Sequence, residues 1–426
     1  MNLKNKYNLN FEEALRRLES IITQTPLTFN KNLSERYKSN IYLKREDLQI
    51  CRSFKIRGAY NMISSLSDKQ QQKGVVCSSA GNHAQGFAHS CNMLKIKGVV
   101  FMPAITPMQK IKQTKMFGDK YIEVILTGDT YDECAIAAKK HAKHNKMTFI
   151  PPFADEKIIE GQGTLVLEVL SQMNELTGSD AAQIDYFLVP IGGGGLCSGV
   201  GVALKGDSRG NNVKIIGLEP SGAAAMNASL QAKKPVILDQ IDTFVDGAAV
   251  KQVSAITYDI CSQVTDDLIL VPEGKICTTI LQLYNEEAIV VEPAGAMSVA
   301  ALDLMKDEIK GKNVVCLICG GNNDIDRMQE IKERSLRYEG LKHYFLVRFP
   351  QRAGALKEFV SEVLGPDDDI TRFEYMQKHN KETGPALVGI LLKDKKDYGK
   401  LLNRMKKFGV NYTKLDKNDN LYGYIV

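Results

Sequence analysis

Short apolar runs separated by longer amphipathic stretches dominate the first three quarters of the chain. Six runs rich in β-branched residues predict strands at residues 74–77, 97–102, 123–126, 185–190, 213–217 and 314–318. Apolar residues at consecutive positions, instead of alternating ones, are typical of strands buried on both faces. Because helical stretches separate these runs, the pattern predicts an α/β fold with mostly parallel sheets covered by helices on both sides.

The spacing of the apolar runs shortens after residues 335–342. The pattern there predicts a strand at 343–349, a helix at 353–364, strands at 370–377 and 385–392, a helix at 396–408 and a strand at 412–417. This βαββαβ order indicates a small α+β ferredoxin-like sandwich, and residues 422–426 are expected to extend its sheet. We therefore expect two domains, residues 1–337 and 338–426.

Composition and charge exclude several classes of function. The 426 residues are 44% hydrophobic and 25% charged, as in an ordinary globular protein. A net charge of +5 without a basic stripe gives no reason to expect a nucleic-acid partner. The first ten residues are polar and no apolar run approaches the roughly 20 residues of a membrane span, so we expect a cytoplasmic protein without a membrane partner. The nine cysteines, mostly inside apolar runs, are predicted to be reduced core thiols.

A lysine in the segment S-F-K-I-R-G-A, residues 53–59, is the first candidate for chemistry. A lysine amine attacks an aldehyde only when it is neutral, and burial or a nearby positive charge favours that form by lowering the pKa. Lys55 has apolar neighbours in Phe54 and Ile56, and Arg57 follows two residues later. The alternative is a surface lysine at the start of a helix.

Two small-residue turns follow predicted strands and suit anions. Residues 78–86, S-S-A-G-N-H-A-Q-G, would expose backbone N–H groups at a helix N-terminus, which suits a carboxylate, although an ordinary capped turn has the same composition. Residues 190–196, P-I-G-G-G-G-L, hold four glycines whose N–H groups can converge on a phosphate. A flexible loop is the alternative. Neither a nucleoside-triphosphate loop nor a dinucleotide fingerprint is present.

Cysteine and histidine pairs invite a metal interpretation, which we reject. Cys316 and Cys319 lie in C-L-I-C-G-G-N-N, residues 316–323, where a strand runs into a glycine turn. Residues three apart on a strand point to opposite faces, and no second ligand pair exists. His141 and His144 lie on a predicted helix without a third ligand and are expected to face solvent. No metal site is predicted.

Together, these four segments resemble the fold-type II pyridoxal-phosphate enzymes, and within them the biosynthetic threonine dehydratases. The motifs S-F-K-x-R-G-A, S-S-x-G-N-H, G-G-G-G-L and x-G-G-N occur in the same order and cover the whole predicted catalytic region. The resemblance implies pyridoxal 5′-phosphate as the cofactor and a two-lobed catalytic domain. The cofactor-binding residues that it implies are Phe54, Lys55, Asn82, Gly192, Gly193, Gly194, Gly195, Leu196, Gly247 and Cys319.

The resemblance also assigns roles to individual residues. Lys55 would hold the cofactor as a Schiff base and act as the general base, with Phe54 and Gly247 on either face of the ring. Asn82 would face the 3′-oxygen and the glycines the phosphate. Cys319 would face the pyridine nitrogen, where most biosynthetic threonine dehydratases have serine. The substrate carboxylate would be held at the turn that comprises Ser79, Ala80, Gly81 and His83.

The implied reaction is the deamination of L-threonine to 2-oxobutanoate and ammonia, and of L-serine to pyruvate, as the first step of isoleucine biosynthesis. A neutral partner such as Cys319 would leave the pyridine nitrogen largely unprotonated, which favours elimination. Racemases of the family have a serine where this chain has Ala80, and an alanine cannot transfer a proton. We therefore predict a dehydratase. Serine racemisation, β-replacement and a non-catalytic amino-acid sensor are the alternatives.

The C-terminal segment has its own resemblance. Residues 343–356, H-Y-F-L-V-R-F-P-Q-R-A-G-A-L, are similar to the opening of the ACT-like domain of biosynthetic threonine dehydratases, with Ala353 in place of a proline. Only one such unit fits, which implies a short form of the enzyme. Isoleucine is the implied effector and a homotetramer the implied assembly. An assembly module without a ligand is the alternative.

Overall fold

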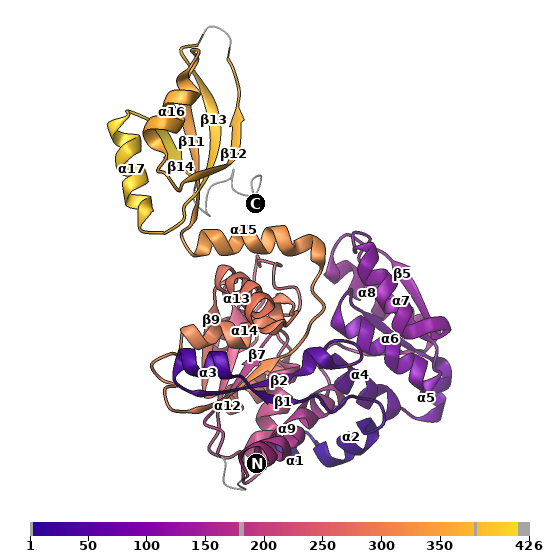
Figure 1. The fold of residues 1–426 in the computed structure, drawn as a ribbon. Coiled ribbons are helices and arrows are strands. Elements are labelled where there is room, and N and C mark those ends of the chain that lie inside the picture. Colours follow the sequence, from indigo (N-terminus) through magenta and orange to yellow (C-terminus); the bar gives the residue numbers. More distant parts are fainter. Residues whose placement is uncertain (1–2, 179–182, 379–380, 416–426) are drawn as a thin grey trace. The chain divides into compact units, whose positions relative to one another are not determined.

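The computed structural model describes residues 3–178, 183–378 and 381–415, which form two compact units (Figure 1). The first unit comprises Met1–Glu273 and Leu283–Asn323, and the second comprises Gly274–Gln282 and Asp324–Val426. The predicted boundary between residues 337 and 338 lies at the end of helix α15 (Met328–Tyr338) and stays a prediction. The predicted sheet extension at 422–426 lies outside the described residues.

The first unit contains a small parallel sheet that is covered on both faces. Its strand order is β5 (Ile122–Leu126), β4 (Gly98–Met102), β3 (Val75–Ser78) and β6 (Thr148–Phe149). Alternate side chains of β3 point to opposite faces: Val75 and Cys77 pack on the side of helix α6 (Asn82–Leu94), and Val76 packs on the side of α8 (Tyr131–Asn145). Burial on both faces is what the consecutive apolar positions predicted.

The larger sheet of the first unit has six strands. Their order is β1 (Leu27–Phe29), β2 (Asn40–Arg45), β10 (Asn313–Ile318), β7 (Tyr186–Pro190), β8 (Lys214–Pro220) and β9 (Asp267–Val271). All neighbours are parallel except β1, which runs antiparallel to β2. Helices α10 (Gly195–Gly206) and α14 (Pro293–Ala300) pack against it. All six predicted strands of the catalytic region are therefore confirmed, within two sheets.

Four strands of this unit are absent from the prediction. Strands β1 and β6 have only three and two residues, too few to give a periodic signal. Strand β9 is only partly buried. Strand β2 ends in Lys44 and Arg45, whose charges interrupt its apolar run, yet the Lys44 side chain is fully buried in an ion pair with Glu168. Lys44 is therefore a core residue, although its charge is typical of a surface residue in the sequence.

Two helices join the sheets, and their contact carries buried charges. Helix α4 (Lys55–Ser64) packs against α9 (Glu156–Thr177) so closely that a Cβ atom on Gly161 would lie 2.5 Å from the Arg57 carbonyl oxygen. The remaining helices of the described residues before 342 are α1 (Leu3–Lys6), α2 (Phe11–Leu18), α3 (Lys31–Tyr37), α5 (Asp68–Lys73), α7 (Met108–Gly118), α11 (Ala225–Ala232), α12 (Ala255–Val264) and α13 (Glu273–Glu287), with 3₁₀ turns at Glu46–Leu48, Asp119–Tyr121, Ala301–Asp303 and Ile325–Arg327.

The second unit contains the ferredoxin-like sandwich that the sequence predicts. Its elements are β11 (Lys342–Pro350), α16 (Ala355–Val363), β12 (Asp369–Tyr375), β13 (Thr383–Leu391), α17 (Asp397–Lys407) and β14 (Asn411–Lys414). The strands form one antiparallel sheet in the order β12-β13-β11-β14. Helix α16 begins two residues later than predicted because Gly354, with φ +86°, forms its N-cap. The core includes Phe345, Phe359 and Val388.

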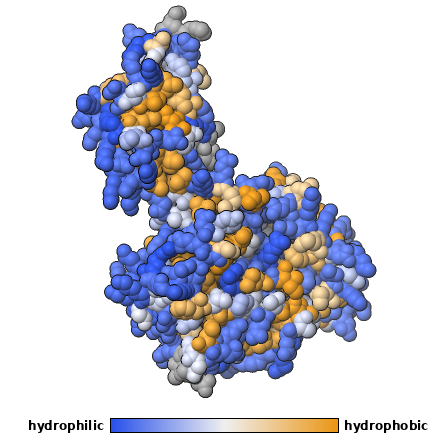
Figure 2. Space-filling view, in the orientation of Figure 1, coloured by the Kyte–Doolittle hydropathy of each residue, from blue (hydrophilic) through white to orange (hydrophobic). Residues whose placement is uncertain are grey.

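The described residues can be compared with the predictions for membrane spans, cysteines and histidines. In the described ranges, no helix combines the length and the apolar character needed to cross a membrane. All nine cysteines are described, and each is a buried thiol outside any disulfide, as predicted. His144 is exposed, whereas His141 is half-buried with its ring 5.3 Å from that of Phe101. Hydrophilic residues cover most of the face seen in Figure 2.

Candidate active site

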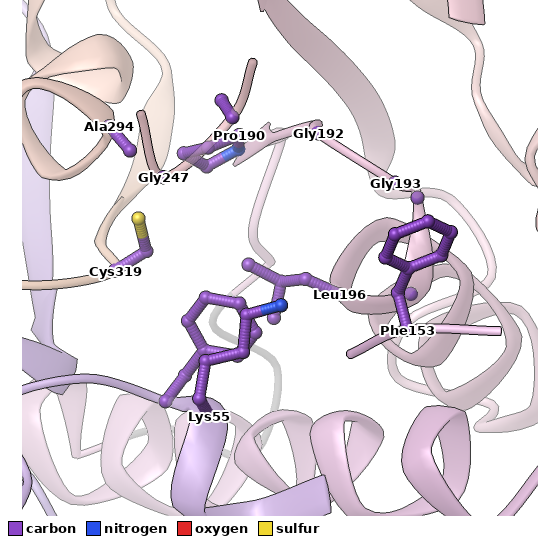
Figure 3. Close-up of a pocket in the computed structure, with 13 residues that line it drawn as sticks. Lys55, Phe153, Pro190, Gly192, Gly193, Leu196, Gly247, Ala294 and Cys319 are labelled. Atoms are coloured by element: carbon purple, nitrogen blue, oxygen red, sulfur yellow. The ribbon is translucent and has the colours of Figure 1, made fainter. Parts of the chain in front are cut away.

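A cavity in the first unit brings the predicted cofactor residues together (Figure 3). Its lining consists of Phe54, Lys55, Phe153, Pro190, Gly192, Gly193, Gly194, Gly195, Leu196, Gly247, Ala248, Ala294 and Cys319. Every predicted cofactor-binding residue except Asn82 is in this set. Segments separated by more than 250 residues in the chain therefore meet at one small site.

Lys55 is the first residue of α4, and its helix starts beside the turn that follows β10. The Phe54 N–H donates a hydrogen bond to the Cys319 carbonyl at 3.2 Å, which ties the start of α4 to that turn. The Lys55 amine donates to the Pro152 carbonyl oxygen at 2.9 Å and lies 5.3 Å from the centre of the Phe54 ring. Burial lowers the pKa of Lys55 to about 8, against the opposing effects of Cys319 and Glu292. Near neutral pH, part of the Lys55 population is therefore a neutral nucleophile.

The glycine loop fits a phosphate group. It connects β7 to α10, so its N–H groups lie at the positive end of a helix. Within the described residues, the backbone N–H groups of 192–196 donate no hydrogen bond. Gly194 has φ +89°, and a Cβ atom on Gly193 would overlap the Phe153 ring. The free donors and the close packing agree with the phosphate end of the predicted cofactor.

A methyl group in this loop should weaken cofactor binding. In Gly193→Ala, the new Cβ must displace Phe153 or the loop, which moves the N–H donors. We expect the stripped protein to bind pyridoxal 5′-phosphate at least about tenfold more weakly, the effect of losing about 1.4 kcal/mol. The measurement is a titration followed by absorbance. Gly206→Ala, at the end of α10 where a Cβ would meet nothing within 4 Å, is the matched control. Equal affinities of the two variants would contradict this assignment.

The turn before α6 lies at the positive N-terminal end of that helix, which suits a carboxylate. Ser79 and Ala80 are half-buried, and a Cβ on Gly81 would meet nothing within 4 Å. The Gly81 N–H donates to Ser79 Oγ at 3.2 Å. His83 donates from Nε2 to the Ile150 carbonyl oxygen at 3.0 Å. Burial, with the nearby charge of Lys55, lowers the pKa of His83 to about 3, so the ring stays neutral.

Asn82 does not line the cavity, but it lies next to it. Its Nδ2 donates to Glu292 Oε1 at 2.7 Å, and Asn322 donates to its Oδ1. A Cβ on Gly320, the residue after Cys319, would lie 3.2 Å from Asn82 Nδ2. Asn82 is thus held beside the turn that carries Cys319.

Cys319 faces the glycine loop across the cavity, and its Sγ points inward (Figure 3). The side chain is 3% exposed, and burial raises the pKa of its thiol well above the usual range, so the group stays neutral. Gly247 and Ala294 lie beside it in the lining. A neutral weak donor at this position agrees with the partner predicted for a pyridine nitrogen.

Several site residues were missed by the sequence analysis. Phe153 packs against the glycine loop, and Ala294 lines the wall near Cys319. Glu292 accepts the hydrogen bond of Asn82. Two signals could have indicated them: the P-P-F of residues 151–153, one residue after β6, and the E-P-A-G-A of residues 292–296 at the start of a buried helix.

Comparisons with known proteins agree with this geometry. The family described as "Pyridoxal-phosphate dependent enzyme" matches residues 18–320, and the "C-terminal regulatory domain of Threonine dehydratase" matches residues 333–425. The chain is 56% identical to the biosynthetic L-threonine dehydratase of Halalkalibacterium halodurans over 96% of both chains. It is 54% identical to that of Bacillus subtilis over 97% of this chain and 96% of the relative.

Solved structures give the same result. Threonine deaminase isoform 2 from Solanum lycopersicum superposes with a TM-score of 0.70 at 36% identity, over 76% of this chain and 93% of that one. Maize serine racemase superposes with a TM-score of 0.69 at 29% identity, over 77% and 97%. The chain belongs to the pyridoxal-phosphate dependent enzymes and, within that family, to the biosynthetic L-threonine dehydratases.

Proposed function

We propose that this protein deaminates L-threonine to 2-oxobutanoate and ammonia, and L-serine to pyruvate, with pyridoxal 5′-phosphate held at Lys55. The observation that carries the proposal is the meeting of a half-buried lysine, a glycine loop with free N–H donors and a neutral thiol in one cavity. The relatives named biosynthetic L-threonine dehydratase, similar over almost the whole chain, support the same substrate. The cofactor, when bound, supplies an electron sink for the charge that develops at the substrate α-carbon.

The residues of the site would bind the substrate carboxylate and remove the α-proton. Backbone N–H groups at the start of α6, with Ser79, would hold the substrate carboxylate. Lys55 Nζ would take the proton from the α-carbon, for which its lowered pKa of about 8 suits it. Ala80 has no group that moves a proton, and His83 stays neutral with its Nε2–H engaged. Lys55 is therefore the proposed base, which favours elimination over racemisation.

An absorbance spectrum with keto-acid assays on threonine and serine tests this function. We expect a visible absorbance from the lysine-bound cofactor, 2-oxobutanoate from L-threonine and pyruvate from L-serine. A colourless protein that forms no keto acid after cofactor addition would favour the amino-acid sensor. Rapid formation of D-serine from L-serine would favour a racemase, the activity named for the maize neighbour.

We propose isoleucine as the effector of the second unit, in a pathway that leads to isoleucine. The match to a threonine dehydratase regulatory domain supports a regulatory role for residues 333–425. Because a ligand that binds only the folded state stabilises it by RT ln(1 + [L]/Kd), isoleucine at 100 times its Kd should add about 2.7 kcal/mol. We expect a higher melting temperature and lower activity with L-isoleucine, and neither with D-isoleucine. If L-isoleucine changes neither the melting temperature nor the activity, the second unit would instead be an assembly module without a ligand.

We also propose a homo-oligomeric assembly, a cytoplasmic location and limits for the two domains. Leu356 and Val360, one turn apart on α16, are 43% and 42% exposed, which supports a homo-oligomer, a tetramer by the family resemblance. Nine buried thiols outside any disulfide support a reducing, cytoplasmic location. We place the catalytic domain at residues 1–337 and the ACT-like domain at 338–426. Light scattering of the purified protein tests the tetramer.

A further inference from the structure

Glu292 is a buried carboxylate beside the cavity that the proposed reaction does not use. It is the N-cap residue of α14, but its side chain makes no capping bond to that helix. Instead it is 4% exposed and accepts a hydrogen bond from Asn82 Nδ2 at 2.7 Å. Asn82 is the first residue of α6, which packs against the small sheet, and Glu292 directly precedes α14, which packs against the large one, so this bond joins the two halves of the first unit.

Two glycines make room for this carboxylate. A Cβ atom on Gly320 would overlap Glu292 Oε1, and one on Gly247 would lie 3.3 Å from it. Gly247 lines the cavity, and Gly320 follows the cavity residue Cys319. Glu292 is therefore packed directly behind the cavity wall, where its charge acts on the groups inside.

The contacts of Asn82 fix which way its amide points. A carboxamide has one oxygen that accepts and two N–H groups that donate. Asn322 donates to the oxygen, and Asn322 itself also donates to the Cys51 carbonyl at 3.2 Å. An ionised carboxylate can only accept, so Glu292 holds the nitrogen of Asn82 towards itself. One N–H of Asn82 is thereby anchored and the other can serve an acceptor in the site.

Burial and the charges around Glu292 together raise its pKa into the working range of an enzyme. Burial, followed by the charge of Asp246, raises its pKa to about 7, whereas the Asn82 hydrogen bond, Lys110 and the Asn322 N–H act in the opposite direction. Asp246 and Lys110 form an ion pair at 2.7 Å. From inside the cavity, Lys55 and Cys319 also face the carboxylate. Above the pKa Glu292 is ionised and can only accept, and below it the protonated form can also donate.

We propose that Glu292 is a positioning residue, whose ionised carboxylate orients the Asn82 amide for the cofactor oxygen and releases it on protonation. The inference rests on the proposed function, because it needs the cofactor in this cavity. It predicts that acidification weakens both cofactor binding and turnover through a group that is not Lys55.

Glu292→Gln tests this role, because it keeps the size of the side chain and removes its charge. The cofactor affinity of the stripped protein and keto-acid formation from threonine are measured between pH 6 and pH 8. An acid with a pKa near 7 loses about tenfold of its ionised form over that interval. Between pH 8 and pH 6 we therefore expect cofactor affinity and keto-acid formation to fall about tenfold less in Glu292→Gln than in the wild type. At pH 8 both should already be lower in Glu292→Gln than in the wild type. Equal falls would overturn the inference.

Glu219→Gln is the matched control. Glu219 is fully buried and burial also raises its pKa to about 7, but it accepts from the Met226 and Asn227 N–H groups and does not contact Asn82. The acid fall of the wild type should persist in this variant. If Glu219→Gln removes the acid fall and Glu292→Gln does not, the group whose protonation causes the fall is Glu219 and not Glu292, and the inference fails.

Two substitutions at the ion pair keep the inference testable even if Glu292→Gln does not fold. Asp246→Asn removes a charge that raises the pKa of Glu292, so the acid fall should move to lower pH. Lys110→Met removes a charge that lowers it, so the fall should move to higher pH. Shifts in these opposite directions support the role, and no shift in either variant overturns it. A wild type that binds no cofactor would instead count against the proposed function, and against the inference with it.

Discussion

Lys55→Ala is expected to abolish the visible absorbance of the protein with its cofactor and to reduce keto-acid formation from threonine by at least about 10²–10⁴-fold. Without the amine at Nζ there is no covalent link to the cofactor and no base at the α-carbon. The glycine loop is untouched, so the phosphate should still bind, more weakly and without the lysine-bound spectrum. Absorbance and a keto-acid assay after desalting measure both effects.

Lys69→Ala is the control for this substitution, because Lys69 is an exposed lysine of helix α5. It should keep the spectrum and the turnover of the wild type. If Lys55→Ala retains normal turnover, Lys55 is not the residue that performs the chemistry, whatever else the cavity binds.

Arg57→Met should lower the free energy of unfolding of the first unit more than any other substitution described for this unit. Arg57 is fully buried and bonds Glu46 at 2.7 Å and Glu168 at 2.6 Å, and Lys44 also bonds Glu168 at 2.6 Å. Removing Arg57 leaves two buried carboxylates with one cation. Losing one partner of a buried ion pair typically costs about 3–5 kcal/mol. We expect a clear fall in the melting temperature of the first unit, measured by calorimetry.

Arg36→Met provides the comparison within the same unit. Arg36 pairs with Glu286 at 2.8 Å, but their side chains are 36% and 41% exposed. Exposed pairs contribute about 0–1 kcal/mol, so this variant should melt near the wild type. If Arg57→Met and Arg36→Met melt alike, the buried network does not contribute to stability as its burial implies.

The sequence predicts the fold well where a strand is apolar on both faces. Strands β3, β4, β7 and β10 are buried along their whole length or nearly so, and such runs need no long-range information. Strand β2 is different, because Lys44 is polar in the sequence and buried only by virtue of Glu168, 124 residues away. Its role depends on tertiary structure, which a local pattern does not contain.

The same division applies to the site. Lys55, the glycine loop and Cys319 lie in short motifs that resemble a family, so their position in one cavity could be predicted. The E-P-A-G-A segment could indicate Glu292 as a site residue, but its role could not be predicted, because it depends on a bond to Asn82, 210 residues earlier in the chain. Phe153 was missed for the same reason, since only folding brings it against Gly193. Motifs identify the groups that bind, whereas the groups that orient them appear only in three dimensions.

Reduction of the cofactor-loaded protein with borohydride, followed by peptide mapping, tests the central claim most directly. Reduction fixes a lysine-bound cofactor as a stable secondary amine, so mass spectrometry can locate it. The account predicts a phosphopyridoxyl group on Lys55, in the peptide that contains S-F-K-I-R-G-A. A label on another lysine, or no label in a protein that converts threonine to 2-oxobutanoate, would contradict it.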